Sequence, residues 1–417
     1  MAVDTQALTI LRDARNGLLN NVRMQYCFMQ AADRFAGYLE ARIQRFHSQQ
    51  VPLCRSGALF VIEQLRKTQP RAKIQKLLQI VDKIPWGIVS GSGMSVVPKS
   101  GTQVFIKNEG YPSGNKPPRL IAFPQEGEKL LMSMAFFHIM HPLFSSPYCT
   151  KEIDEHARPK FIERRLGDLP HRFVADYTSF ECVPNKFLMQ LGEHRVLRRL
   201  VSPEYSFLFD LIERGGTLRA KNGFSIRTPA VQFSGRYTTS MSNTIRNKLL
   251  LDACAIYMGI QDYRAVYEGD DSLSAWPEAV TVDRLTRALG RLGVEAEIAQ
   301  IEKYGEAGYC STYWNDKFEV ICDPIKVIAT FPFSNSQLAN SQKNARPLLA
   351  AKAMSLAYRA PGCPIVWAIA RKYISSIGLM ETRNEYERKW FRSFSSFHSN
   401  KKYSSKKRST LFVHFDR

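Results

Sequence analysis

The chain has 417 residues and a formal net charge of +20, with 58 Lys and Arg residues against 38 Asp and Glu residues. Apolar residues make up 44% and charged residues 23%, which is ordinary for a globular protein with room for two or three packed subdomains. A positive surplus of this size favours a polyanionic partner, nucleic acid ahead of an acidic membrane surface.

The cysteines and the apolar runs argue against a disulfide- or zinc-stabilised protein and against a membrane-spanning one. None of the eight cysteines forms a CxxC pair or a zinc-type spacing with histidine, so we expect reduced thiols in a cytosolic setting. The start of the sequence does not resemble a signal peptide, and the longest apolar run, LLLDACAIYMGI, is too short to span a bilayer. We therefore expect no membrane-spanning segment, although a partner could hold the chain on a membrane.

The N-terminal third predicts helices followed by extended chain. Apolar residues recur at helical spacing over 5–48 and again over 58–84. The Gly- and Ser-rich stretch 86–101 predicts a loop. Residues 102–110 predict a strand ending in a turn, and 111–124 an extended, basic segment stiffened by prolines.

The middle of the chain predicts helices on either side of a strand. Helices are expected over 125–140 and in part of 151–166, and HRFVADYTSFE predicts a strand over 171–181. More helices follow, and a long helical pattern runs from about Thr238 to Gly259.

The last third begins with a predicted hairpin. In YEGDDSLSAW, residues 267–276, apolar segments flank two aspartates, which predicts a hairpin with the aspartates at its turn. A helix is expected over 279–292, a strand over 294–301 and a second hairpin over 309–324. The remainder is mostly helical and ends in a basic, Ser-rich tail.

Three acidic and polar segments stand out in this pattern. Asp270 and Asp271 are adjacent like charges, which are costly to bury unless something positive neutralises them. A lone Gly-Asp-Asp triplet is a weak signal, but DYTSFE places Asp176 at a strand end with Glu181 five residues on. SGRYTTSMSN then fits the pattern S-G-x3-T-x3-N at the start of the long helix.

The order and spacing of these segments resemble palm motifs A, B and C of the RNA-dependent RNA polymerases of positive-strand RNA viruses. The segment KPPRLI and the general layout look closest to the tombusvirus-like and nodavirus-like groups, and the resemblance covers residues from about 100 to 325. It implies an α+β right-hand fold with fingers, an antiparallel palm sheet backed by helices, and a thumb. The divisions we expect are fingers 1–170, palm 171–190, fingers insertion 191–230, palm 231–330 and helical thumb with basic tail 331–417.

The resemblance also implies a two-metal reaction that adds ribonucleoside triphosphates to RNA. Two Mg²⁺ ions, with Mn²⁺ as a substitute, would be held by Asp176, Asp270 and Asp271, because hard cations prefer carboxylate oxygens. The ions would also neutralise the adjacent aspartates. A lysine in the region of Lys303 serves the family as general acid for pyrophosphate.

Further residues are expected to bind the substrate and the primer. Glu181, where the family usually has Asp, and the polar residues of motif B would recognise the ribose 2′-hydroxyl, and an acceptor at 181 favours ribonucleotides over the bulky aromatic of a reverse transcriptase. The remaining expectations are Ser234, Gly235, Thr239 and Asn243 at the sugar and template, Lys107, Lys116 and Arg119 of motif F at the triphosphate, and Cys310 and Ser311 at the tip of the motif E primer-grip hairpin.

RNA template, RNA product and ribonucleotides are therefore the expected partners, with other viral or host replication proteins alongside. We expect the host cytoplasm as the location, on membrane-associated replication complexes reached through partners. Two alternatives stay open: a reverse transcriptase-like polymerase on the same palm, and a basic RNA-binding protein with an inactive palm. Intact Asp176, Asp270 and Asp271 speak against the second.

Overall fold

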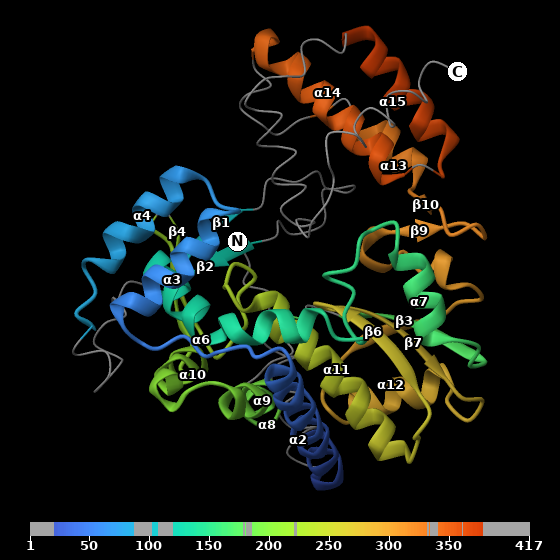
Figure 1. Cartoon of the computed structure of the whole chain (residues 1–417). Helices are drawn as coiled ribbons and strands as arrows, with labels where there is room; N and C mark the ends of the chain where they lie inside the picture. The colour runs from blue at the N-terminus through green and yellow to red at the C-terminus, as the bar shows by residue number, and fades with distance from the viewer. Residues whose placement is uncertain are drawn as a thin grey trace. The chain divides into compact units, whose positions relative to one another are not determined.

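Two units make up the chain in the computed structural model (Figure 1), which describes residues 21–86, 102–106, 120–177, 180, 186–220, 223–331, 333, 341–360 and 362–377. The first unit comprises residues 1–151 and 164–304, and the second comprises 152–163 and 305–417. The aspartates and the motif B residues all belong to the first unit.

In the described residues, the first unit is built from helices around two sheets. Its helices are α2 (Val22–Arg45), α3 (Arg55–Arg66), α4 (Arg71–Val81), α6 (Glu126–Phe144), α8 (Lys186–Leu191), α9 (Glu193–Leu200), the 3₁₀ helix η2 (Pro203–Tyr205), α10 (Ser206–Glu213), α11 (Thr239–Met258) and α12 (Val282–Gly290). Helix α7 (Arg158–Leu166) and the 3₁₀ helix η3 (Tyr304–Glu306) cross the boundary between the units.

Local sequence explains where the N-terminal helices begin and end. The side chain of Asn21 caps α2 by accepting a hydrogen bond from the amide of Met24, as N-cap residues do. The single helical pattern predicted over 58–84 is two helices, α3 and α4. Pro70 separates them as the N-cap of α4, because proline fixes its own φ and offers no backbone N–H to continue a preceding helix.

The sheet that carries the acidic motifs is antiparallel throughout, as predicted. It consists of β6 (Arg264–Glu268), β7 (Asp271–Trp276), β3 (His171–Tyr177) and β8 (Ala296–Gln300), in that spatial order. Helix α11 contacts β6 and α12 contacts β8, and the two helices lie together against the sheet in Figure 1. The α+β class is therefore confirmed at this level, and the predicted 279–292 helix and 294–301 strand are α12 and β8.

The second sheet of this unit is mixed. Strands β1 (Thr102–Ile106) and β2 (Leu120–Phe123) form one antiparallel pair, β4 (Gly216–Ala220) and β5 (Ser225–Thr228) form another, and β1 and β4 run parallel. The predicted strand over 102–110 and the extended segment ending at 124 are confirmed in their described parts. The β4–β5 hairpin was not predicted.

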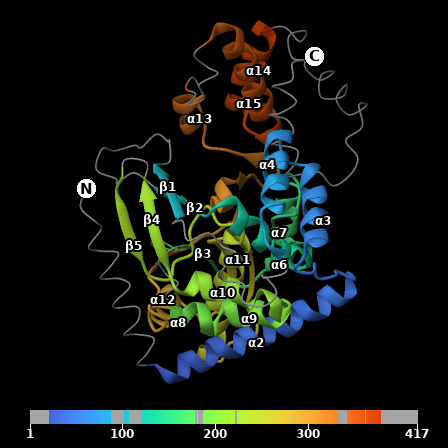
Figure 2. The same ribbon diagram turned by 90° about the vertical axis from the view of Figure 1, so that its left-hand side faces the viewer.

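Helix α11 is the centre of the first unit's core. It packs against α2, α9, α12 and β6, and α2 crosses beside α8 and α9 in Figure 2. Fourteen of its twenty residues are buried, on all sides of the helix, which is typical of a helix enclosed by other elements. Polar residues on α11 must therefore find hydrogen-bond partners inside the protein.

Beyond residue 304, the described part of the second unit forms a small hairpin, a 3₁₀ helix and three α-helices. Its elements are the 3₁₀ helix η4 (Tyr309–Ser311), β9 (Tyr313–Trp314), β10 (Val320–Ile321), α13 (Pro324–Thr330), α14 (Gln342–Arg359) and α15 (Pro364–Ile377). Helices α14 and α15 pack on each other, and Ala360, Cys363 and Val366 form a small apolar core. No helix within the described ranges combines the length and apolar character that crossing a bilayer requires.

Candidate catalytic site

Acidic residues line one end of the antiparallel sheet, strand by strand. Glu268 pairs with Asp271 across the β6–β7 hairpin, and Asp176 of β3 pairs with Glu297 of β8. The β3–β7 pairing ends at Ala175 and Ser272, so Asp176 and Asp271 are the next residues on these two strands. Paired positions on neighbouring strands share a face. We call Glu268, Asp271, Asp176 and Glu297 the acidic row.

The acidic row faces away from helix α11. Tyr177, the neighbour of Asp176, is buried and points to α11, where its hydroxyl donates to Asn247, and strand residues alternate between faces. Asp176 and Asp271 are exposed, and Glu268 accepts a hydrogen bond from the hydroxyl of Thr150 at 2.8 Å. Like charges on paired strand positions repel, so this end of the sheet favours a cationic ligand.

Gly269 and Asp270 form the two-residue turn of the predicted hairpin, whereas Asp271, also expected at the turn, is the first residue of β7. Gly269 has φ +68°, a left-handed conformation that glycine adopts without strain. The side chain of Asp270 is exposed at the tip of this turn, next to the acidic row. The three aspartates singled out by the sequence therefore lie at the same end of one sheet.

Carboxylates at a common sheet end have the chemistry of a site for hard divalent cations. Within the described ranges, however, no group of three or more His, Cys, Asp or Glu side chains lies close enough together to hold a metal ion. Two features support a metal ion here: the oxygen ligands that these carboxylates offer, and their position at the same end of one sheet.

Two side chains of α11 contact the backbone of the hairpin turn. The amide of Gly269 donates to Thr244 Oγ1 at 2.9 Å. Asn247 Nδ2 donates to the carbonyl oxygens of Asp270 at 2.7 Å and Gly269 at 3.3 Å. Helix α11 thus binds the turn through buried polar groups.

The Ser-Gly turn before α11 lies against the second sheet. The Gly235 amide donates to the carbonyl of Ala122 in β2 at 2.9 Å, and a Cβ at Gly235 would stand 2.6 Å from that oxygen. Glycine is therefore required here by close backbone approach and not by a positive φ. The Thr239 hydroxyl lies 2.7 Å from the carbonyl oxygen of Phe233 and 2.9 Å from that of Arg236, which ties the turn to the helix start.

Ser234 is exposed at this turn, while its neighbour Arg236 is buried. The Arg236 guanidinium lies 3.5 Å from the carboxylate of Glu128 on α6 and donates to the carbonyl of Val231 at 2.9 Å. Burial raises the pKa of Glu128, and the positive charge of Arg236 opposes that rise. The pair anchors the turn to α6.

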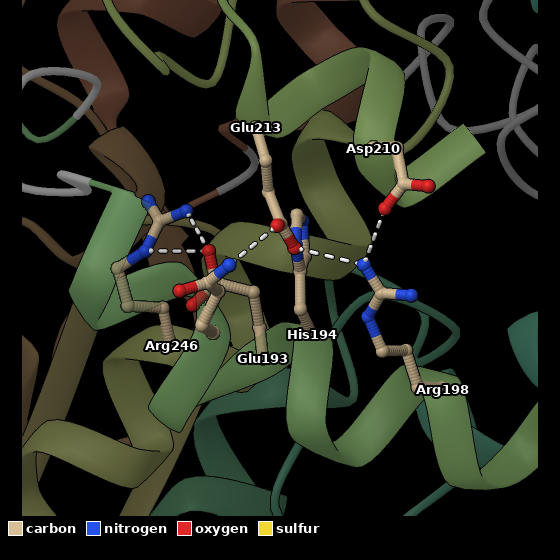
Figure 3. A network of polar contacts seen from close by, with 7 residues as sticks. Glu193, His194, Arg198, Asp210, Glu213 and Arg246 are labelled. Carbon is tan, nitrogen blue, oxygen red and sulfur yellow. Dashed lines mark hydrogen bonds and ion pairs between the residues drawn. The ribbon is translucent and has the colours of Figure 1, made fainter. Parts of the chain in front are cut away.

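Asn243 lies in α11 beside a buried ion pair. Its side-chain oxygen accepts a hydrogen bond from Arg246 at 3.3 Å, and the same guanidinium pairs with Glu193 of α9 through two nitrogens (Figure 3). The Arg246 and Glu193 side chains are each 1% exposed. Arg246 also lies over the ring of Phe180, which precedes Glu181 in the chain. The buried Arg246–Glu193 pair therefore fixes the position of the Asn243 side chain.

A second polar cluster adjoins this pair on α9 and α10. His194 lies 2.7 Å from the Glu213 carboxylate, and Arg198 donates to both Glu213 and Asp210 (Figure 3). Burial raises the pKa of Glu213, but hydrogen bonds from His194, Gln190 and Arg198 outweigh it and lower the pKa to about 2. The cluster joins α9 to α10, away from the acidic row.

Lys303 is not brought to the acidic row. Strand β8 runs antiparallel to β3, so its Gln300 end pairs with Phe173, three residues or about 10 Å from the row of Asp176. Lys303 follows beyond Gln300, at the far end of the sheet. The direction of β8 therefore separates this lysine from the three aspartates.

Cys310 and Ser311 are not at a hairpin tip, which corrects the prediction. The second predicted hairpin is present as β9 and β10, but its turn comprises residues 315–319. Cys310 and Ser311 lie before β9 in η4, with φ values of +51° and +58°. Their proposed contact with a primer stays a prediction.

Four predicted substrate residues, Glu181, Lys107, Lys116 and Arg119, lie outside the described residues. In contrast, the structure adds residues that the sequence did not single out: Glu268 and Glu297 in the acidic row, and Thr244 and Asn247 at the turn. Helical spacing could have found Asn247, which follows Asn243 by one turn of the predicted helix. Glu297 depends on the register of β8, which the sequence does not state.

A comparison with known protein families indicates a class of protein for this chain. A model of the family described as viral RNA-directed RNA-polymerase matches residues 194–310, which include motif segment SGRYTTSMSN and the hairpin turn but not Asp176. The match covers less than half of the chain and supports a viral RNA-directed RNA polymerase at a coarse level. No curated protein matches the chain.

Proposed function

We propose that this chain is the RNA-directed RNA polymerase of a positive-strand RNA virus, with a right-hand architecture. The observation that carries the proposal is the acidic end of the antiparallel sheet, where Asp176, Asp270 and Asp271 all lie. The family match to viral RNA-directed RNA polymerases supports it. The finer placement among tombusvirus-like and nodavirus-like polymerases, and the division into fingers, palm and thumb, depend on the sequence resemblance alone.

The proposed reaction joins a ribonucleoside triphosphate to the 3′ end of RNA by in-line attack on its α-phosphate. Two Mg²⁺ ions, or Mn²⁺ in their place, would lower the pKa of the attacking hydroxyl and stabilise charge on the leaving pyrophosphate. Asp176 and Asp270 would hold them, with Asp271 beside them. Lys303 is not included in this set, because β8 carries it to the other end of the sheet.

Selection of ribose would rest on motif B together with Glu181. Asn243 lies at the buried face of α11 with its oxygen bound by Arg246, so its amide donors remain for a sugar hydroxyl. The Thr239 hydroxyl is engaged by backbone carbonyls and supports the Ser234–Gly235 turn instead. We expect Glu181→Tyr to lose ribonucleotide incorporation, measured with each of the four nucleotides. Unchanged incorporation would remove residue 181 from the sugar site.

RNA binding would use the positive surplus of the chain. Phosphate contacts by Lys and Arg release counterions, so affinity for RNA should fall steeply with added salt. The host cytoplasm, and membrane-associated complexes reached through other replication proteins, remain the proposed location.

The deciding experiment is nucleotide incorporation on an RNA template, with Mg²⁺ and with a chelator. The wild-type chain is expected to incorporate nucleotides with Mg²⁺ and not with the chelator, and Asp270→Asn is expected to abolish incorporation. Asp262→Asn is the matched control, because Asp262 is an exposed aspartate whose one ion pair among the described residues is with Arg264 at 3.5 Å, at the opposite end of β6. This control should incorporate nucleotides like the wild type.

The outcomes separate the competing functions. An inert wild type, or an active Asp270→Asn variant, would contradict the polymerase assignment and favour an RNA-binding role. Incorporation of deoxyribonucleotides in preference to ribonucleotides on the same template would favour a reverse transcriptase.

A further inference from the structure

Asn247 occupies a junction between three separate parts of the chain. It is fully buried on α11. Its Nδ2 group donates to the carbonyl oxygens of Gly269 and Asp270, and its Oδ1 accepts from the hydroxyl of Tyr177 at 2.9 Å. One side chain therefore joins the turn that carries Asp270 to the strand end that carries Asp176.

Thr244 makes a second connection to the same turn, one helical turn earlier. Its Oγ1 accepts from the Gly269 amide at 2.9 Å, while its own proton goes to the carbonyl of Ser240 at 2.7 Å. Between them, Thr244 and Asn247 bind the amide of Gly269 and the carbonyls of both turn residues. Pairing between the strands stops at Glu268 and Asp271, so the ladder does not bind these groups.

Because these hydrogen bonds are buried, losing any one of them would be costly. A buried polar group that loses its partner carries its full desolvation penalty, so the turn is stable only where α11 places the matching donor and acceptor. The turn is also where two like charges meet, and their repulsion would move a turn that the ladder alone held. Hydrogen bonds from a rigid helix oppose that movement.

We infer that Thr244 and Asn247 are positioning residues that fix the separation between the Asp176 and Asp270 carboxylates, and so set the affinity of this sheet end for divalent cations. The inference rests on the proposed function. Neither residue would be a ligand of the cation, because their polar side-chain atoms bind the turn, Ser240 and Tyr177. Both act through the backbone of the turn, as outer partners orient the ligands of metal sites, where their loss typically costs about 10–100-fold in metal affinity.

The first test compares two substitutions at one position. Thr244→Val keeps the shape and removes the acceptor for the Gly269 amide, whereas Thr244→Ser keeps the hydroxyl. We expect Thr244→Val to weaken Mn²⁺ binding to the full chain, measured by isothermal titration calorimetry, by about 10-fold. Thr244→Ser should stay within about twofold of the wild type. The Mg²⁺ concentration for half-maximal incorporation should rise in parallel in the valine variant.

Two further variants separate positioning from stability. Tyr177→Phe removes only the hydroxyl that Asn247 accepts from, and we expect a smaller loss of Mn²⁺ affinity than for Thr244→Val. Ile245→Val shortens a fully buried apolar residue of α11 next to Thr244 and lowers stability without touching the turn. Its Mn²⁺ affinity should equal that of the wild type.

Amide hydrogen exchange gives a readout that needs no metal. Exchange in the peptide covering 267–272 should accelerate in Thr244→Val and not in Ile245→Val. If the wild type binds Mn²⁺ and incorporates nucleotides while Thr244→Val matches it in affinity and Mg²⁺ dependence, the inference alone is overturned. If the wild type neither binds Mn²⁺ more tightly than Asp270→Asn nor incorporates nucleotides, both the inference and the proposed function are overturned.

Discussion

Replacing Arg246 by Met should destabilise the first unit severely, because it leaves a buried carboxylate without its counter-charge. The Arg246 and Glu193 side chains are each 1% exposed. Two guanidinium nitrogens contact one Glu193 oxygen, and the other oxygen already has no hydrogen-bond partner among the described residues. Because Glu193 is almost fully buried, water cannot solvate its carboxylate once the positive charge is removed.

The size of the effect follows from that burial. Removing one member of a buried ion pair typically costs about 3–5 kcal/mol, a large part of the roughly 5–15 kcal/mol that stabilises a folded domain. Arg246→Lys should recover only part of this loss, because a single ammonium cannot reach both Glu193 and Asn243 in the way a planar guanidinium does. Replacing both partners by apolar residues, Arg246→Met with Glu193→Leu, should recover more.

Urea unfolding followed by circular dichroism measures these differences, with a matched substitution on an exposed pair as control. Arg195 of α9 makes two hydrogen bonds to Asp33, but their side chains are 39% and 47% exposed. Arg195→Met should therefore cost at most about 1 kcal/mol. The reasoning would be refuted if Arg246→Met were no more destabilising than Arg195→Met.

Three further predictions concern the neighbouring elements. The pKa of Glu213 is lowered to about 2, so the stability that this group contributes is present above its ordinary pKa near 4.5 and is lost as pH falls toward 2. Glu213→Gln should therefore flatten the acid limb of a pH–stability curve, and an unchanged limb would contradict the lowered pKa. Gly235→Ala would place a Cβ 2.6 Å from the Ala122 oxygen. We therefore expect about 1–3 kcal/mol of destabilisation and a raised KM for nucleotides. A variant with wild-type stability and KM would show that the turn moves freely. Gly269→Ala has open space for its Cβ but keeps φ +68°, so unfolding measurements should show a loss of only about 1–2 kcal/mol, and a larger loss would point to packing at the turn.

The sequence alone determined the elements that carry strong local signals. The period of apolar residues predicted α2, α11 and α12, and the apolar segments around Asp270 and Asp271 predicted the β6–β7 hairpin, because both patterns arise from neighbours within one element. The sequence also contains a signal typical of the β4–β5 hairpin, because Asn222 and Gly223 stand between alternating apolar and polar residues. Proline at position 70 similarly marked the break between α3 and α4.

Only the tertiary structure decided which distant residues meet. The register of β8 brought Glu297 to Asp176 and carried Lys303 to the other end of the sheet, although both lysine and glutamate follow the hairpin in the chain. Helical spacing places Asn247 on the same side of α11 as Asn243, but only the packing of α11 against the β6–β7 hairpin shows that Asn247 contacts the turn. Strand register and helix orientation are set by burial summed over the whole core, so no local stretch of sequence contains them.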